Sequence, residues 1–254
     1  MAPEDLTYRI GPRAQEVYRR RAGEVMHVER EPPEALEAIR RNLGTLNFSA
    51  QYQQDPQPAE GHAIKRDWIR SYDAVPDTFD LKIVSRDTAS TVTDAADWSV
   101  GTVWGAVGQQ YYLLHVERGR WEAPELRRRM IALSREHRAD ATLIEDTELG
   151  RALSQDLRRT GELYPLLQQA RFDKLARLLA QAARFEAGQV HLPPEAPWLG
   201  AYVSELLAFP TGRHDDQVDA TSQALKYLTS RTPVERTRPQ RVNRPQHVRR
   251  PERR

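Results

Sequence analysis

The feature that most constrains the fold is an alternation of strand-like and helix-like segments between residues 77 and 230. Short runs of apolar, aromatic and β-branched residues predict strands at 81–85, 98–107, 111–116, 141–145 and 163–167. Amphipathic segments with a period of 3.6 residues predict helices at 122–137, 148–159, 171–186 and 215–229. This order is typical of an α/β domain in which helices flank a mixed β-sheet.

The segments on either side of this region differ from it in composition. We interpret residues 1–75 as an irregular N-terminal segment with a short helix at 34–43, and residues 76–230 as the folded domain. Residues 231–254 hold nine Arg, four Pro and only two Glu, which predicts a disordered basic tail. A net charge of +7 suits a nucleic-acid-binding arm, although a solvated terminus has the same composition.

Residue types that are missing exclude several classes of protein. The 254 residues contain no Cys, which excludes a disulfide framework, a Cys-ligated zinc site, an iron–sulfur cluster and a thiol nucleophile. No run approaches 18 consecutive apolar residues, and the first ten residues lack the apolar core of a secretory signal. We therefore expect a soluble cytoplasmic protein with no membrane partner.

Acidic residues stand at three points where such a fold brings chain segments together. Asp87 follows one predicted strand and Glu145 closes another, so both carboxylates should project from the carboxyl edge of the sheet, where open α/β sheets bind ligands. Asp215, Asp216 and Asp219 begin the last predicted helix, and the i, i+4 spacing places Asp215 and Asp219 on one face. We expect the three groups to converge, although each also has an ordinary explanation as a turn residue, a surface acid or a helix cap.

Converging carboxylates need positive charge, because like charges a few ångströms apart raise one another's pKa. Hard oxygen ligands without a thiol indicate Mg²⁺ or Mn²⁺ rather than zinc. Two such ions about 4 Å apart can activate a water molecule and stabilise the leaving oxygen of a phosphodiester. The sequence therefore favours hydrolysis of a phosphodiester.

Aromatic and histidine residues carry less functional information. Base stacking is one interpretation of the five tryptophans, but packing in the core is more typical of aromatic side chains, including Trp98 and Trp104 in predicted strands. The histidines are scattered and show no zinc spacing.

Three acidic motifs together resemble those of a known family. They are Ser85-Arg-Asp-Thr-Ala89 with Asp97-Trp-Ser-Val-Gly-Thr-Val-Trp-Gly105, then Leu143-Ile-Glu-Asp146 with Gly150, then His214-Asp-Asp-Gln-Val-Asp-Ala220. This pattern resembles the nuclease domain of the large subunit of tailed-bacteriophage terminases, and the resemblance runs from about Phe48 to Leu228. The segment upstream of the domain is similar to the part that joins the family's ATPase to its nuclease.

The resemblance implies an RNase H-like endonuclease that cleaves concatemeric double-stranded viral DNA during genome packaging with two divalent cations, Mg²⁺ or Mn²⁺. It implies partners as well: double-stranded DNA, a small terminase subunit, a portal and a packaging ATPase, in the cytoplasm of a host cell. By position, Asp87, Glu145, Asp215 and Asp216 are the catalytic metal ligands, Asp219 and His214 are auxiliaries, and Lys174 and Arg177 contact DNA.

Two departures from the family pattern bear on this interpretation. No G-x-x-x-x-G-K-[ST] motif occurs, so we expect this chain not to translocate DNA with ATP by itself, as an excised piece, a separate nuclease half or a prophage remnant. Arg86 stands directly before Asp87, where relatives often carry an apolar or aromatic residue, and we expect it to pair with Asp87 or to contact DNA.

Two alternative functions stay open at this point. One is a non-catalytic module that docks on DNA or a portal, or an inactive prophage remnant. The other is an RNase H-like resolvase, which would prefer four-way junctions to linear duplex.

Overall fold

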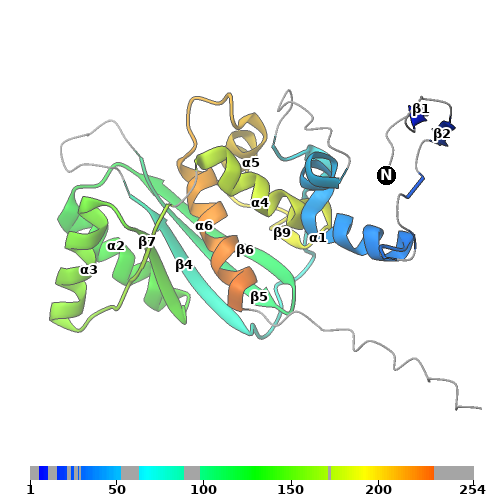
Figure 1. Ribbon diagram of the computed structural model, residues 1–254. Helices are drawn as coiled ribbons and strands as arrows, with labels where there is room; N and C mark the ends of the chain where they lie inside the picture. Colours follow the sequence, from blue (N-terminus) through cyan, green and yellow to red (C-terminus); the bar gives the residue numbers. More distant parts are fainter. Residues whose placement is uncertain are drawn as a thin grey trace, which may run out of the picture.

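The structure is a computed structural model, and it describes residues 6–10, 16–21, 24–25, 28, 30–52, 63–88, 98–170 and 173–231. Its centre is a seven-stranded sheet (Figure 1). In spatial order the strands are β3 (Arg70–Ser71), β9 (Val190–Leu192), β6 (Gln110–Gly119), β5 (Ser99–Val107), β4 (Leu81–Asp87), β7 (Ala141–Glu145) and β8 (Leu166–Gln168).

The sheet combines an antiparallel centre with parallel edges. The strands β4, β5 and β6 follow one another as antiparallel neighbours, and Gly108, with φ at +53°, lies in the turn between β5 and β6. The neighbours β7 and β8 run parallel to β4, and β9 runs parallel to β6. The chain passes from β6 to β7 through α2 (Ala123–Glu136), and β7 then runs in the same direction as β4. As a result, β4 and β7 finish side by side at their carboxyl ends.

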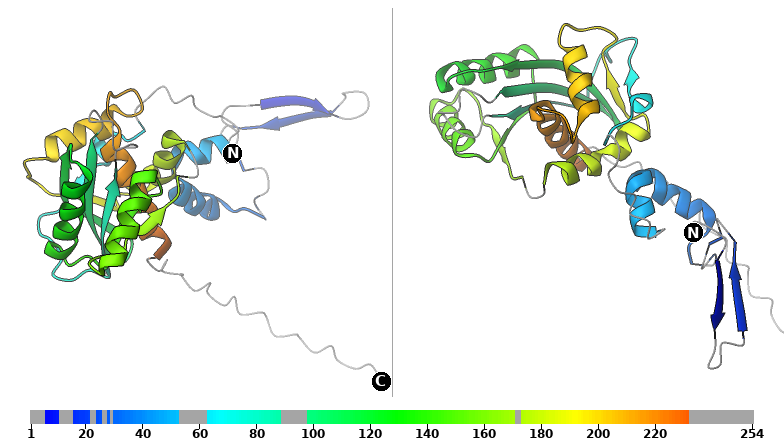
Figure 2. Two further views of the ribbon diagram at one scale, coloured as in Figure 1. Left: turned by 90° about the vertical axis from the view of Figure 1, so that its left-hand side faces the viewer. Right: turned by 90° about the horizontal axis from the view of Figure 1, so that it is seen from above.

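Helices cover both faces of the sheet (Figure 2). The helix α2 packs with α3 (Glu148–Thr160) on one face, and α6 (Asp216–Arg231) crosses the strands β4 and β5 on the other. Two further helices, α4 (Lys174–Glu186) and α5 (Leu199–Ala208), pack against α6. Successive strand residues point to opposite faces, so fully buried Ile83 packs toward α6 while Val84 packs toward α2. This alternation decides which face receives each polar residue at the end of β4.

The N-terminal part contributes one long helix and a small hairpin. The helix α1 spans Pro33–Tyr52 and packs against α4, with non-helical dihedral angles at Gly44. A Cβ atom on Gly44 would stand 2.9 Å from the Cβ of Ala183, and its φ of +76° also disfavours other residues. The strands β1 (Leu6–Ile10) and β2 (Glu16–Arg20) form a separate antiparallel pair, and the short 3₁₀ helix η1 covers Arg66–Trp68.

The predicted α/β class, the central hairpin and the strands at 81–85 and 141–145 are confirmed, and the four predicted helices exist with ends shifted by up to three residues. The predicted strand at 163–167 is observed as Leu166–Gln168, and the helix at 34–43 extends to Tyr52. Neither β9 nor α5 was predicted. Because β3 pairs with β9, the sheet begins upstream of residue 76. Most of the predicted tail, 232–254, lies outside the described residues.

Trp104 has no exposed surface, which agrees with the interpretation that this tryptophan packs in the core. Among the described residues, no helix is both long and apolar enough to cross a membrane.

Candidate active site

The first two acids meet because β4 and β7 are parallel neighbours in register. Arg86 pairs with Ile144, so the next residue of each strand, Asp87 and Glu145, reaches the same edge of the sheet. Their carboxyl groups lie within hydrogen-bond distance of each other. Two carboxyl groups share a hydrogen bond only if one of them holds a proton.

Side-chain hydrogen bonds tie α6 to the end of β4. The Ser85 hydroxyl donates to the carbonyl of Ala220 (2.8 Å). The Gln223 amide donates to the Ser85 hydroxyl (2.9 Å) and to the Arg86 carbonyl (3.2 Å), one residue before Asp87. These contacts hold the helix that carries the last acidic motif against the strand that carries the first.

Two acids of α6, Asp216 and Asp219, complete the cluster around Asp87. Burial raises the pKa of Asp87 well above its ordinary value, and the nearby carboxylates of Asp219, Glu145 and Asp216 raise it further. Residues separated by as many as 132 positions therefore act on one carboxyl group, which shows that the three predicted acidic groups converge.

The pKa values of the two inner α6 acids shift in the same direction. Burial raises the pKa of Asp216, and Glu205 adds to the rise while Arg118 opposes it. Burial also raises the pKa of Asp219, against the opposing effect of Lys174. Both groups are thus placed where protonation or a cation is favoured.

Two basic residues of α4 reach into this cluster. The Lys174 ammonium lies 2.7 Å from Asp215 Oδ1 and 2.9 Å from Asp219 Oδ2. Asp215, directly before α6, and Asp219, in its first turn, therefore lie on the same side, as their i, i+4 spacing predicted. Arg177 Nη2 lies 2.7 Å from Asp219 Oδ1, and its Nη1 lies 3.6 Å from Glu145 Oε1. Burial lowers the pKa of Lys174, but its hydrogen bonds to the two aspartates outweigh this effect and raise the pKa.

A third cation approaches from β6. Arg118 Nη2 lies 3.4 Å from Asp216 Oδ2, and its Nη1 lies 3.2 Å from Glu205 Oε2. Glu205 is buried and accepts hydrogen bonds from the Gln217 backbone N–H (2.7 Å) and the Gln217 side chain (2.6 Å). Its carboxylate therefore satisfies a free N–H at the start of α6 and fixes the position of that helix end.

Close packing fixes the loop that follows Glu145. The hydroxyl of Thr147 accepts a hydrogen bond from the backbone N–H of Gly150 (3.0 Å) and so caps α3, and it lies 3.3 Å from the hydroxyl of Thr88. A Cβ atom on Gly150 would stand only 2.1 Å from the Glu145 carbonyl oxygen. Only glycine allows α3 to begin this close to the end of β7.

The expectations for Arg86 are wrong. Its side chain has no exposed surface, so it cannot reach DNA, and it points to the α2 face, away from Asp87. There it pairs with Glu117 and lies beside Trp121, with its guanidinium 6.0 Å from the ring centroid. A Cβ atom on Gly101 would stand 2.7 Å from the Arg86 guanidinium carbon, so this glycine provides the space.

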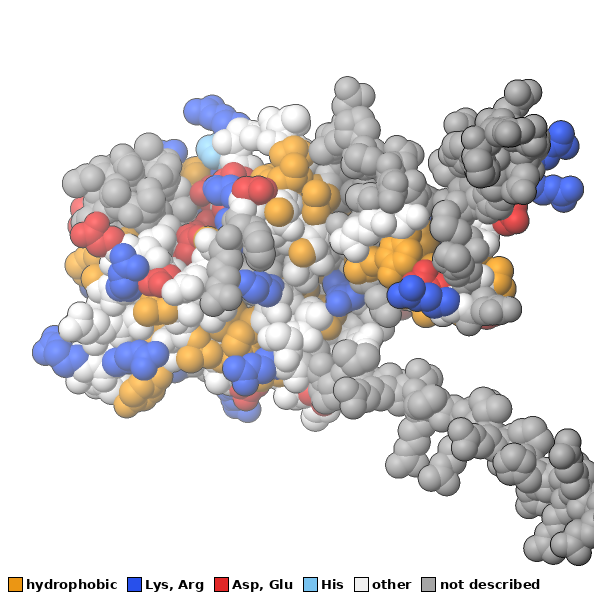
Figure 3. Space-filling view, in the orientation of Figure 1, with side chains coloured by type: hydrophobic (Ala, Val, Ile, Leu, Met, Phe, Trp, Pro, Cys, Tyr) orange, Lys and Arg blue, Asp and Glu red, His pale blue; other side chains and the backbone are white. Residues whose placement is uncertain are grey.

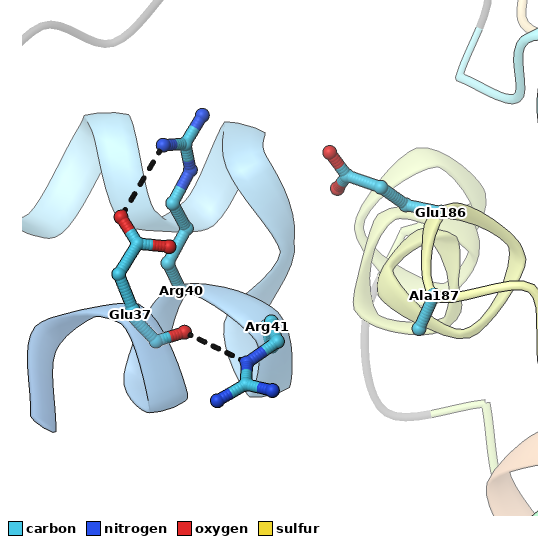
Figure 4. Close-up of a pocket in the computed structure, with 5 residues that line it drawn as sticks. All are labelled: Glu37, Arg40, Arg41, Glu186 and Ala187. Carbon is cyan, nitrogen blue, oxygen red and sulfur yellow. Dashed lines mark hydrogen bonds and ion pairs between the residues drawn. The ribbon is translucent and has the colours of Figure 1, made fainter. Parts of the chain in front are cut away.

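His214 directly precedes the α6 acids and is half-buried, but its side chain makes no hydrogen bond or ion pair within the described part of the chain. A cavity of about 250 Å³ lies elsewhere, between α1 and the C-terminal end of α4 (Figure 4). It is lined by Glu37, Arg40, Arg41, Glu186 and Ala187. Lys174 stands at the opposite end of α4, about 18 Å away along the helix. None of the predicted site residues lines this cavity.

The side chains do not form a ready-made metal site: over the described ranges, no group of three or more His, Asp or Glu is arranged to hold an ion. Lys174 and Arg177 hold the carboxylates of Asp215, Asp219 and Glu145 instead. The chemistry of the donor set still suits a hard divalent cation, because carboxylate oxygens alone converge on a buried edge where they raise the pKa of Asp87. Figure 3 shows acidic and basic side chains interleaved around the upper end of α6.

Four residues that organise this edge were not predicted from the sequence: Arg118, Glu205, Gln217 and Gln223. The alternation of side chains along β6 was the available signal for Arg118. The other three depend on how α5 and α6 dock, and no local pattern reveals that contact.

Comparisons with known proteins agree with this fold. The family model described as the terminase RNaseH-like domain matches residues 84–228. The large terminase of a thermophilic bacteriophage, solved in complex with ADP, superimposes with a TM-score of 0.60 at 13% identity, covering 78% of this chain and 52% of that one. The nuclease of the large terminase of thermophilic phage G20c, solved with bound magnesium, superimposes with a TM-score of 0.50 at 19% identity. This match covers 66% of this chain and 98% of that one.

These matches define the extent of the similarity. The chain spans about half the length of the large terminase solved with ADP, and the solved structures are similar in fold. Among curated proteins, nothing matches this chain. The family model covers more than half of the chain and includes all three acidic motifs, so the chain belongs to the terminase RNase H-like nuclease domain family.

Proposed function

We propose that this chain is a metal-dependent endonuclease that cleaves double-stranded viral DNA during genome packaging. The observation that carries the proposal is the convergence of Asp87, Glu145 and the α6 acids on one buried edge of an RNase H-like sheet. The related nuclease of phage G20c has been solved with bound magnesium, which supports the use of a divalent cation.

Charge balance supports cation binding at this edge. Six carboxylates meet there, Asp87, Glu145, Glu205, Asp215, Asp216 and Asp219, and three cations oppose them, Lys174, Arg177 and Arg118. With all groups ionised the formal charge is −6 plus +3, which is −3. One divalent cation would leave −1 and two would leave +1. The cluster therefore has the charge to hold one or two such ions.

We assign the ligand roles to Asp87, Glu145, Asp215 and Asp216, with Asp219 and His214 as auxiliaries. Divalent cations at this site, Mg²⁺ or Mn²⁺ and two in number, would activate a water molecule and stabilise the leaving 3′ oxygen. Asp87 lies beside Glu145 and close to Asp216 and Asp219, so it would take part in holding the cations together with these acids. Lys174 and Arg177 would turn from the carboxylates toward backbone phosphates once metal charge replaces theirs, which positions DNA without reading its sequence.

A nicking assay on supercoiled plasmid tests the proposal. We expect cleavage with Mg²⁺ or Mn²⁺, and a loss of at least about 100-fold in Asp87→Asn and Glu145→Gln. Asp73→Asn is the matched control, because this exposed acid lies outside the cluster, and it should cleave like the wild type. DNA binding without cleavage under any of these metals would refute the enzyme and favour the docking module or inactive remnant. Preferential cleavage of four-way junctions would instead favour a resolvase.

The wider setting of the activity is part of the same proposal. We infer that residues 76–230, together with β3, form the nuclease unit, that residues 1–75 include the connection to a packaging ATPase, and that a small terminase subunit and a portal are partners in the host cytoplasm. The similarity of the chain to about half of the large terminase solved with ADP supports this arrangement. Mixing the chain with a separately expressed packaging ATPase and measuring co-elution would test it.

A further inference from the structure

An aromatic ring with two arginines lies beside the candidate active site. The guanidinium carbon of Arg118 is 4.5 Å from the centroid of the Trp98 ring, and that of Arg120 is 4.6 Å from it. Stacking on an indole fixes the plane of a guanidinium group while leaving its N–H edge available for hydrogen bonds.

Strand register places this group next to the acids. Val100 of β5 pairs with Asp87 on one side and with Arg118 on the other. Residues directly opposite one another in a sheet share a face, so Asp87 and Arg118 both point toward α6. In the order of the strands, Arg118 lies on the β6 side of Asp87, whereas Arg177 reaches Glu145 on the β7 side. Cations therefore flank the carboxylate cluster on two sides.

The two arginines differ in their partners. Arg118 is 22% exposed and pairs with Asp216 and Glu205. Arg120 is exposed, and within the described ranges it pairs with no carboxylate. Two guanidinium groups against one ring repel each other, and the ring offsets only about 0.5–1 kcal/mol of that at an exposed site. The carboxylates of Asp216 and Glu205 offset the charge of Arg118, so an anion beside the ring would chiefly neutralise Arg120.

We propose that Trp98, Arg118 and Arg120 form a binding site for a backbone phosphate of the DNA strand next to the cut position. A phosphate offers oxygens in the geometry that the guanidinium fork matches, and contact with the backbone requires no particular base. The site deepens the proposed nuclease function and rests on it, because it is the proximity of Arg118 to Asp216 that connects this phosphate to the reaction. Arg120 supplies the free charge, and Trp98 orients both arginines.

Fluorescence anisotropy with a labelled duplex of about 30 base pairs tests this site. It is measured in EDTA and in Ca²⁺, with salt varied between about 50 and 200 mM. We expect Arg120→Gln to weaken binding about five- to tenfold at the lowest salt and to reduce the slope of log K against log salt by about one. Trp98→Phe retains a ring and should bind nearly normally, whereas Trp98→Ala should lose affinity as Arg120→Gln does. Circular dichroism checks that each variant is folded.

Arg159→Gln is the matched control. Arg159 is 75% exposed and lies in the last turn of α3, outside the cluster, so its removal should leave the salt slope unchanged. An Arg120→Gln protein with the slope of the wild type would overturn the site. Cleavage is measured separately on plasmid, so the two proposals can fail independently. If the wild type never cleaves DNA but Arg120→Gln reduces the salt slope, the phosphate site stands and the nuclease function is refuted. If the wild type cleaves DNA but Arg120→Gln leaves the salt slope unchanged, the nuclease function stands and the phosphate site is refuted.

Discussion

The contact between Gly150 and the end of β7 gives the sharpest structural prediction. Replacing Gly150 with Ala would place a Cβ atom 2.1 Å from the carbonyl oxygen of Glu145. Real Cβ contacts are essentially never shorter than 3.0 Å, so the two groups must separate by at least about 0.9 Å. The neighbour is backbone rather than a flexible side chain, so the start of α3 or the end of β7 has to move. Movement of the end of β7 would carry Glu145 away from Asp87.

The expected size of the effect follows from this displacement. Overpacking a tight site costs about 1–3 kcal/mol, and the gain in helix propensity from Gly to Ala returns up to about 1 kcal/mol. A net loss of about 1–2 kcal/mol lowers the Tm by about 2–8 °C for a domain of this size. A displacement of nearly 1 Å at a candidate ligand reduces the cleavage rate by about 100-fold.

Thermal unfolding by circular dichroism and plasmid nicking at a temperature where all variants are folded measure the two effects. Gly200→Ala is the matched control, because Gly200 also lies in the first turn of a helix but a Cβ atom there meets nothing within 4 Å. This variant should be as stable as the wild type or slightly more so, with unchanged cleavage. A Gly150→Ala protein that behaved like Gly200→Ala in both assays would refute the argument from packing.

Three other substitutions probe the charges of the fold. Asp87→Asn removes one charge from a group of crowded carboxylates, so the Tm of this variant in EDTA should be higher than that of the wild type. Adding Mn²⁺ should raise its Tm by less than it raises the Tm of the wild type. Equal increases would exclude Asp87 as a ligand. Glu205→Ala removes the acceptor of both Gln217 donors from a buried position and should lower the free energy of unfolding in urea by about 3 kcal/mol, whereas a change below about 1 kcal/mol would contradict its structural role. Burial lowers the pKa of His137, and the charge of His115 lowers it further. The unfolded state therefore binds more protons than the folded state, and stability falls as the pH drops below about 6.5. His137→Gln should flatten the dependence of Tm on pH between about 5 and 7, and an unchanged dependence would refute this explanation.

The sequence was sufficient to predict the positions of the acids because local patterns determine them. Asp87 and Glu145 end apolar strands, and two parallel neighbours necessarily finish at the same edge. Asp215 and Asp219 share a helix face because of their spacing, and Lys174 binds both of them. Strand parity and helix periodicity are local properties, so they could be deduced without knowledge of the tertiary fold.

Other features depend on contacts between distant segments, and these were missed. β9 and α5 are short or lack a clear pattern, and β9 is held in place mainly by pairing with β6. The role of Glu205 depends on α5 meeting the start of α6, 12 residues later in the chain. The error over Arg86 has a different cause: neighbouring residues of a strand point to opposite faces of the sheet, so parity along β4 already separated the side chains of Arg86 and Asp87. Its partner, Glu117, became identifiable only with the register between β5 and β6.

That register also explains why a buried arginine precedes the central acid. Asp87, Val100 and Arg118 form a row on the α6 face, and the adjacent row of Arg86, Gly101 and Glu117 lies on the α2 face. A slip of β4 by one residue would turn Asp87 into the α2 core and Arg86 into the carboxylate cluster. Glu117 would then lose Arg86 and face the carboxyl group of Asp87 instead, at a cost of several kcal/mol. The ion pair between Arg86 and Glu117 on the α2 face therefore stabilises the strand register in which Asp87 faces α6. Residues outside the carboxylate cluster thus help to determine its geometry.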